Sequence, residues 1–372
     1  MKKILFVFGT RPEAIKMAPL IKEFSLFPGL YQTVTCITGQ HRQMLDQVLE
    51  FFSITPDYDM NLMRADQSLF DITSNGLKAL EAVLEDCAPS LVFVQGDTTT
   101  AFIGALACYY KKIKVAHLEA GLRSGNRLSP FPEEGNRLMI GHLADFHFPP
   151  TSTAQQNLAR ENIRQNVFVV GNTVIDALHL GLQIIQEKEE PYRAYFQQLD
   201  LSKKIILVTG HRRESFGEPF ENICSAIKEI AQTFEEVEIV YPVHLNPNVQ
   251  EVVNRQLNGY ANIHLLAPLE YPHLLWLMSK CYLVLTDSGG IQEEAPSLGK
   301  PVLVMRDITE RMEGIEAGTA VLVGTHKATI VQKITDLLTD EPLYQSMATA
   351  VNPYGDGTTS KQIVSLFQDL PL

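Results

Sequence analysis

The residues best suited to bind an anion are Ser288, Gly289 and Gly290, where an apolar run over 282–286 gives way to a helical pattern. Glycines let the backbone approach an anion closely, and the first N–H groups of a helix point toward it with the positive end of the dipole. Glu294, one turn into that helix, can accept hydrogen bonds from ribose hydroxyls. Taken alone, the segment is equally compatible with an ordinary strand-to-helix turn.

Cations follow two further predicted strands. Arg11 and Lys16 come after the apolar run 4–8, and His211 follows the run 205–209 together with two arginines. Surface arginines and lysines are usually just solvated, but positions directly after strands favour a shared ligand edge. His211 and its neighbouring arginines are suited to stabilising charge on a diphosphate leaving group. With these cations, we interpret Ser288-Gly289-Gly290 as a diphosphate site.

Three carboxylates are candidates for proton transfer. Asp97 and Glu119 follow the predicted strands 91–95 and 115–118, and Glu133 begins a predicted helix. Two simpler explanations exist: Asp97 can cap the helix that Thr98 opens, and Glu133 can be a first-turn acid favoured by the helix dipole. Three acids at one cleft are nevertheless what general acid–base catalysis needs. Nearby cations, namely Arg123, Arg127 and Arg137, are expected to keep some of them ionised.

The spacing of histidines, cysteines and acids predicts no metal site, and no Gly-x-Gly-x-x-Gly follows either first strand. We therefore expect acid–base chemistry without a metal or a nicotinamide cofactor.

The elements that must position these residues alternate along the chain. Near-continuously apolar runs predict buried parallel strands, with helical patterns such as 14–26 and 71–84 between them. The predicted strands are 4–8, 32–37, 91–95, 115–118 and 146–148, and then 205–209, 238–243, 263–265, 282–286 and 301–304. Two series of βα units predict an α/β protein with two doubly wound, Rossmann-like domains facing a cleft.

The length of 372 residues exceeds the roughly 250–300 at which one hydrophobic core usually stops growing. We place the N-terminal domain at 1–171, completed by a C-terminal helix within 354–372, and the C-terminal domain at 172–353. A charged stretch over 183–204 predicts a helix followed by the connection between the domains.

Composition narrows the partners and the compartment. A net charge of −12 argues against nucleic-acid binding, which rewards a basic face. The longest apolar stretch, 101–110, is well short of the ~18 residues of a membrane span. Five scattered cysteines predict no disulfide framework and fit a reducing compartment. We expect a cytoplasmic protein that binds neither nucleic acid nor membrane.

The motifs together resemble those of one family. They are Phe8-Gly9-Thr10-Arg11-Pro12-Glu13, Gln95-Gly96-Asp97-Thr98, His117-Leu118-Glu119-Ala120-Gly121-Leu122-Arg123, Pro132-Glu133-Glu134, the segments at His211 and Ser288, and Asn352-Pro353-Tyr354-Gly355-Asp356-Gly357. Essentially from end to end, the chain resembles the non-hydrolysing UDP-N-acetylglucosamine 2-epimerases of bacteria, which have the glycosyltransferase-B fold.

This resemblance implies reversible inversion at C2, giving UDP-N-acetylmannosamine for cell-surface polysaccharide. UDP leaves to give a bound 2-acetamidoglucal and adds back after C2 is reprotonated on the other face. Asp97, Glu119, Glu133 and His211 are then catalytic; which acid serves which face stays open. No cofactor is implied, and a homodimer is expected.

The resemblance also implies binding roles for individual residues. Substrate contacts are expected from Arg11, Lys16, Asp97, Glu119, His211, Leu269, Leu274, Ser288, Gly289, Gly290, Glu294 and Arg311. Leu274 stands where an aromatic residue often stacks on the uracil. Gln40, Gln43 and His244 match parts of a second, activating UDP-N-acetylglucosamine site, whereas Asp66 stands where regulated members have a basic residue.

Two other functions are compatible with the same diphosphate site at Ser288-Gly289-Gly290. A glycosyltransferase of this fold transfers the sugar only when an acceptor is present, and a non-catalytic sensor binds the nucleotide sugar without turnover. The three acids favour the epimerase, because a sensor has no use for them.

Overall fold

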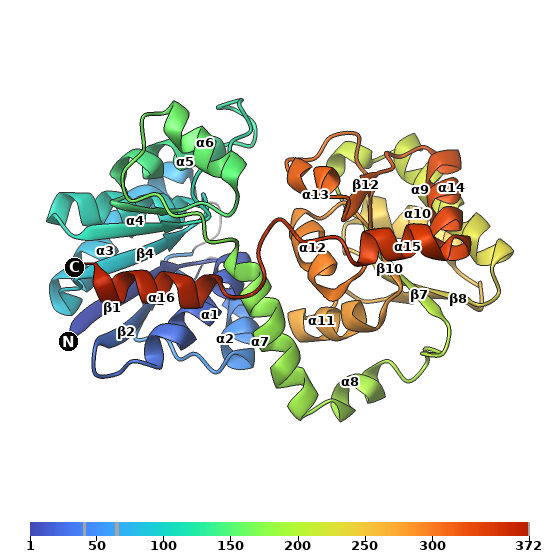
Figure 1. Cartoon of the computed structure of the whole chain (residues 1–372), viewed down its shortest axis with the longest axis horizontal. Coiled ribbons are helices and arrows are strands. Elements are labelled where there is room, and N and C mark those ends of the chain that lie inside the picture. The colour runs from blue at the N-terminus through green and yellow to red at the C-terminus, as the bar shows by residue number, and fades with distance from the viewer. Residues whose placement is uncertain (40–41, 64–66, 371–372) are drawn as a thin grey trace. The chain divides into compact units, whose positions relative to one another are not determined.

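The computed structural model describes residues 1–39, 42–63 and 67–370, which form two compact units. Unit 1 comprises Met1–Leu180 and Tyr354–Leu372, and unit 2 comprises Gly181–Pro353. Each unit is built on its own six-stranded parallel sheet with helices on both faces (Figure 1). This is the predicted pair of doubly wound, Rossmann-like domains. Among the described residues, no helix is long and apolar enough to cross a membrane.

The sheet of unit 1 has the order β3-β2-β1-β4-β5-β6. Its strands are β1 (Lys2–Phe8), β2 (Tyr31–Ile37), β3 (Tyr58–Asp59), β4 (Leu91–Gln95), β5 (Lys114–Leu118) and β6 (Phe146–Phe148). The helices are α1 (Arg11–Ser25), α2 (Arg42–Phe51), α3 (Leu69–Cys87), α4 (Thr99–Lys111), α5 (Glu133–Leu143), α6 (Ser152–Arg160), α7 (Thr173–Glu187), which continues into unit 2, and α16 (Thr359–Asp369). The strand order reverses between β1 and β4, where ligands of such sheets usually bind.

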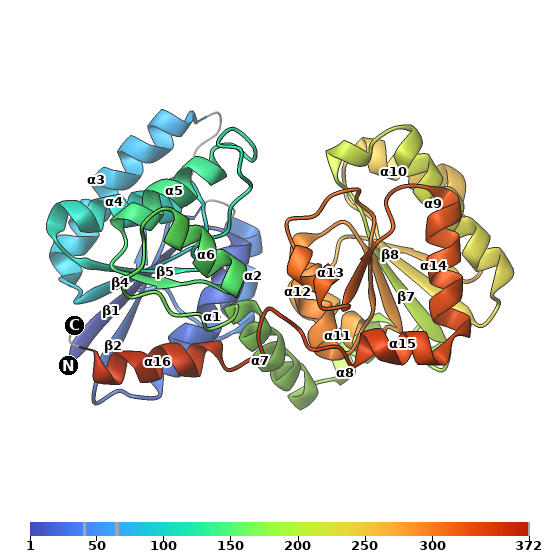
Figure 2. The same cartoon turned by 45° about the horizontal axis from the view of Figure 1, so that its top comes forward.

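The chain returns to unit 1 at its C-terminus, and aromatic packing holds this last helix in place. The α16 helix packs alongside α1 and lies at the lower edge of unit 1 in Figure 2. Phe367 is fully buried, with its ring centroid 5.7 Å from that of Phe93 on β4 and 5.1 Å from that of Phe146 on β6. The C-terminal helix is therefore part of the core of unit 1.

The sheet of unit 2 has the order β12-β11-β10-β7-β8-β9, with the reversal between β7 and β10. Its strands are β7 (Lys204–Thr209), β8 (Val237–Pro242), β9 (Ile263–Leu266), β10 (Leu283–Thr286), β11 (Val302–Val304) and β12 (Ala320–Leu322). The helices are α8 (Glu190–Tyr195), α9 (Glu218–Thr233), α10 (Pro247–Leu257), α11 (Tyr271–Lys280), α12 (Gly289–Glu294), α13 (Met312–Glu316), α14 (Lys327–Thr339) and α15 (Glu341–Ala348), with short 3₁₀ turns at Arg213–Ser215 and Ala295–Leu298. Figure 2 shows α9, α10 and α14 on one side of this sheet and α11 and α12 on the other.

Candidate active site

Lys16 and Glu119 form an ion pair beyond the carboxyl ends of β1 and β5. The ammonium lies 2.7 Å from Oε1 and 2.6 Å from Oε2 of the carboxylate. Both side chains are mostly buried, with exposures of 14 % for Lys16 and 8 % for Glu119. Glu119 also has a positive φ of 60°, an uncommon conformation for a residue with a side chain. A strained backbone and a buried ion pair at a strand end are typical of a functional position.

Two amides also contact the carboxylate of Glu119. Gln95, the last residue of β4, donates from Nε2 to Oε2, and Asn172 donates from Nδ2 to Oε1 at 3.3 Å. A carboxylate that accepts hydrogen bonds in its charged form is favoured as an anion. Neither amide was predicted as a site residue, because they meet Glu119 only once the sheet has formed.

Asp97 is held by groups from α5. Its carboxylate lies 2.6 Å from Nη2 of Arg137, and its backbone carbonyl accepts from Nδ2 of Asn136 at 2.9 Å. The α4 helix is capped by Thr98, whose side chain accepts from the backbone of Ala101. The simpler explanation of Asp97 as the helix cap is therefore wrong, because the next residue has that role.

Glu133 is the first residue of α5 and is half-buried. Within the described part of the chain it makes no hydrogen bond or ion pair, so it is available for a ligand. Its neighbour Glu134 is engaged instead: this carboxylate accepts from the backbone of Ser124 at 3.0 Å and from Arg137 at 2.9 Å. Glu134 thus ties the loop before α5 to the arginine that holds Asp97.

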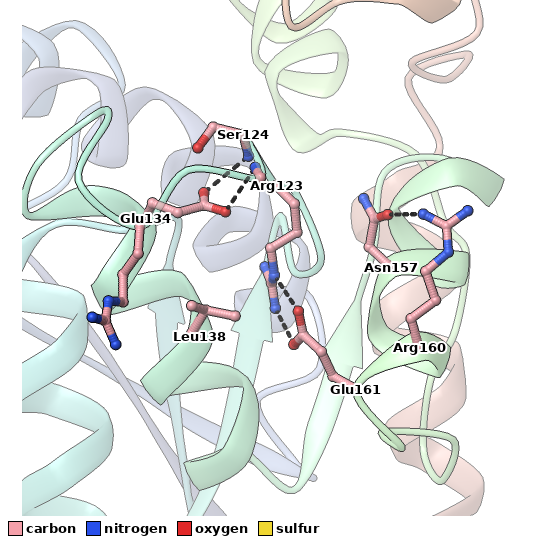
Figure 3. Close-up of a pocket in the computed structure, with 9 residues that line it drawn as sticks. Arg123, Ser124, Glu134, Leu138, Asn157, Arg160 and Glu161 are labelled. Carbon is pink, nitrogen blue, oxygen red and sulfur yellow. Dashed lines mark hydrogen bonds and ion pairs between the residues drawn. The ribbon is translucent and has the colours of Figure 1, made fainter.

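The three arginines near the acids have separate roles. Arg137 forms an ion pair with the candidate acid Asp97, whereas Arg123 forms a two-pronged pair with Glu161, with both distances 2.7 Å. Arg127 and Arg160 line a hollow of about 510 Å³ beside this pair (Figure 3). The expectation that Arg123 helps to ionise the acids was therefore wrong, because Glu161 takes up its guanidinium.

Glu13 organises the loop between β1 and α1. Its fully buried carboxylate accepts from the backbone of Gly9 at 3.0 Å and of Thr10 at 2.7 Å, and from the Thr98 hydroxyl at 2.5 Å. Burial raises the pKa of Glu13, against the lowering effect of these hydrogen bonds. The loop that carries Arg11 is therefore joined to the loop that carries Asp97. The Thr-x-x-Glu spacing of a capping box was the available sequence signal.

In unit 2, Asp287 organises the loop after β7. One of its oxygens accepts from the backbone of His211 at 2.7 Å and of Arg212 at 2.8 Å. The imidazole of His211 stacks on that of His244, with ring centroids 4.8 Å apart. Burial lowers the pKa of His211, as do His244 and Arg212, against the raising effect of Asp287. At neutral pH the His211 ring is accordingly a neutral hydrogen-bond donor, and an arriving anion would favour its protonation.

The segment Ser288-Gly289-Gly290 opens α12, as expected. A Cβ on Gly289 would lie 3.1 Å from the guanidinium carbon of Arg311, so glycine permits a close approach there. Arg311 in turn donates from Nε to the buried Glu293 at 2.9 Å. The predicted diphosphate site and Arg311, which is predicted to bind the nucleotide, thus lie next to each other.

Other predicted nucleotide contacts lie nearby in unit 2. Glu294 is buried and accepts from the hydroxyl of Tyr271 at 3.2 Å. Leu274 is half-buried on α11, and Leu269 is half-buried just before that helix. Tyr271 lies in the segment expected beside the uracil.

The predicted activating site is only partly described. Gln40 and Asp66 lie outside the described residues, and Gln43 belongs to α2 but its side chain is not described. His244, stacked on His211, is described. Arg11, the first residue of α1, is half-buried.

The described residues contain no group of three or more histidine, cysteine, aspartate or glutamate side chains arranged to hold a metal ion. The five cysteines are free and buried.

The whole chain matches known proteins of one kind. A family model described as UDP-N-acetylglucosamine 2-epimerase matches residues 29–368. The UDP-N-acetylglucosamine 2-epimerase of Escherichia coli K12 is 53 % identical over 371 residues, covering 99 % of this chain and 98 % of that protein. The one from Campylobacter jejuni is 51 % identical, covering 98 % of this chain and 97 % of that protein. A crystal structure of the Neisseria meningitidis UDP-GlcNAc 2-epimerase bound to UDP-GlcNAc superposes with a TM-score of 0.90 at 48 % identity, covering 99 % and 100 % of the two chains.

Proposed function

This chain belongs to the UDP-N-acetylglucosamine 2-epimerase family, and on that premise we propose that it interconverts UDP-N-acetylglucosamine and UDP-N-acetylmannosamine. The observation that carries the proposal is the buried carboxylate of Glu119, which Lys16 holds at the end of β5, with the acid Asp97 following the neighbouring strand β4. Such groups can remove and return the proton at C2, which is the one stereocentre that must invert.

The proposed reaction proceeds by elimination and re-addition. A carboxylate takes the C2 proton while the bond between C1 and the UDP oxygen breaks, leaving 2-acetamidoglucal and UDP. A second acid then delivers a proton to the opposite face of C2 while UDP re-forms its bond to C1. Asp97, Glu119 and Glu133 are the proposed proton carriers, and their individual roles are open. The reaction consumes no oxidant or reductant, so these side chains are sufficient for both proton transfers.

Stabilisation of the departing UDP is the second requirement. We assign it to Arg11, His211 and the backbone amides of Ser288-Gly289-Gly290, with Arg311 and Glu294 on the nucleotide. A diphosphate that draws on Lys16 would also weaken that lysine's hold on Glu119. A carboxylate with less cationic stabilisation is a stronger base, so leaving-group binding and base activation would be linked.

The test is solvent exchange. In D₂O, the enzyme should place deuterium at C2 of recovered UDP-N-acetylglucosamine, and Glu119→Gln should abolish this while UDP still binds. A glycosyltransferase or a sensor would leave C2 unlabelled, and a transferase would need an acceptor. Folded protein that binds UDP-N-acetylglucosamine but exchanges no proton would overturn the proposal.

The proposal also covers the pathway, the compartment and the oligomeric state. The product would serve cell-surface polysaccharide synthesis, the enzyme would act in the cytoplasm, and it would be a homodimer. Light scattering that gives twice the chain mass supports the last assignment, and the mass of a single chain would refute it.

A further inference from the structure

Asn172 lies where both chain connections between the units begin in unit 1. It immediately precedes α7, the helix that runs into unit 2, and its backbone N–H donates to the carbonyl of Tyr354 at 2.7 Å. Tyr354 is the first residue of the segment that returns to unit 1. Asn172 is itself 3 % exposed. One buried residue thus touches both connections.

The side chain of Asn172 has a fixed orientation. Its Oδ1 accepts from the backbone N–H of Val174 at 3.1 Å, in the first turn of α7. This leaves the Nδ2 group to donate to Oε1 of Glu119 at 3.3 Å. The assignment of nitrogen and oxygen follows from the network, because the opposite orientation would place two acceptors and two donors face to face.

The neighbouring backbone leaves little freedom for this arrangement. Gly171 has a φ of 89°, and a Cβ there would lie 3.0 Å from the carbonyl oxygen of Tyr354 and 2.9 Å from the hydroxyl of Thr359. That hydroxyl donates to the carbonyl of Val170 at 2.9 Å. The returning segment therefore packs directly against the backbone that presents Asn172.

We infer that Asn172 is a positioning residue that ties the orientation of Glu119 to the two connections between the units. Its amide holds one carboxylate oxygen, while Gln95 holds the other and Lys16 contacts both. If either connection moved, Asn172 would be displaced, and its hydrogen bond would pass that displacement to the carboxylate of Glu119. This rests on the proposed function insofar as Glu119 takes part in proton transfer.

Asn172→Asp separates this role from helix capping. Aspartate retains the oxygen that Val174 uses and caps helices about as well as asparagine. It loses the donor toward Glu119 and puts a second carboxylate beside it, which disfavours the ionised form of both. We expect kcat for exchange at C2 to fall between about ten- and a hundredfold at pH 7, the effect of losing one hydrogen bond to a charged group. KM should stay close to the wild-type value, whereas Tm should fall at pH 7 and recover at lower pH, where one of the two carboxyls takes up a proton.

The pH dependence of kcat distinguishes a positioning role from a merely structural one. Its acidic limb should move to higher pH in Asn172→Asp. Asn166→Asp is the control for the chemical change alone: Asn166 is an exposed residue of unit 1 whose amide donates to the backbone carbonyl of Asp145 at 3.0 Å and not to Glu119. It should leave rate and profile unchanged. Asn172→Ala, which removes the cap as well, should lower both Tm and kcat.

A readout without turnover keeps the inference separate from the proposed reaction. The carboxyl ¹³C resonance of Glu119, assigned by its absence in Glu119→Gln, should titrate at higher pH in Asn172→Asp than in wild type. If the wild-type enzyme exchanges no proton but this shift occurs, only the proposed function fails. If Asn172→Asp keeps the wild-type rate and pH profile, or shows an unshifted Glu119 resonance, the positioning role is wrong.

Discussion

Removing the ammonium of Lys16 should expose how strongly Glu119 depends on it. In Lys16→Met the mostly buried carboxylate keeps its two amide donors but loses the cation at 2.6–2.7 Å. Breaking a buried ion pair from one side typically costs about 3–5 kcal/mol, because an uncompensated charge stays behind. Glu119 can avoid this cost by taking up a proton.

Proton uptake sets an upper limit on the loss. For an ordinary glutamate pKa of about 4.3, protonation costs about 3.7 kcal/mol at pH 7 and about 1 kcal/mol at pH 5. We therefore expect Lys16→Met to lower the free energy of unfolding of unit 1 by about 3 kcal/mol at pH 7 and by less than about 1 kcal/mol at pH 5. Glu119→Gln should cost less, about 1.5 kcal/mol, because Lys16 is the more exposed of the two and its flexible stem lets the ammonium turn to water. The double variant, with both charges gone, should cost about 2 kcal/mol. The coupling free energy would be about 2–3 kcal/mol.

The assay is urea unfolding at both pH values, followed by far-UV circular dichroism and by fluorescence. The chain has a single tryptophan, Trp276, which lies in unit 2. The substitutions should therefore shift the dichroism transition of unit 1 more than the fluorescence transition. Additive single effects, or a Lys16→Met cost as large at pH 5 as at pH 7, would refute the view that the two charges depend on each other.

Two more predictions follow from buried and paired groups. Burial lowers the pKa of His117 to about 3 and that of His147 to about 4, so the unfolded chain binds more protons than the folded one below about pH 6.5. The stabilisation from these neutral histidines should thus be fully present above that pH and be lost as the pH drops toward 4. In His117→Gln, the free energy of unfolding, measured with urea, should depend less steeply on pH; an equally steep dependence would contradict this. Arg137→Met should slow exchange at C2 about tenfold or more, because the carboxylate of Asp97 loses the cation that positions it, whereas Arg160→Met should leave the rate unchanged. A wild-type rate in Arg137→Met would show that Asp97 does not need this arginine.

The parts of the fold that the sequence predicted are those governed by local rules. Apolar runs such as 91–95 became buried strands, and the helical pattern at 14–26 became α1. The edge strands β3 and β12 were not predicted, because they contain two and three residues and carry no distinctive pattern. The order of the strands within each sheet was not predicted, because the apolar pattern does not say which strands lie side by side.

Candidate site residues could be proposed from the sequence where they lie within two positions of a strand end. Glu119, His211 and Ser288 all do, and their types suggested their chemistry. Asn172 was not predictable, because its partner lies 53 positions away and meets it only after both the sheet and the returning segment have formed. Arg123 was misjudged for a related reason: Glu161, 38 positions away, neutralises it. Contacts between distant segments decide such cases, and a single sequence carries no signal for them.

The proposed proton movement at C2 of UDP-N-acetylglucosamine can be measured by incubating the purified protein with this nucleotide sugar in D₂O and recording the proton NMR spectrum of the recovered nucleotide sugar. We expect the C2 proton signal to disappear while UDP-N-acetylmannosamine forms, and neither change in Glu119→Gln. A C2 signal of undiminished intensity, with protein that is folded and binds the substrate, would contradict it.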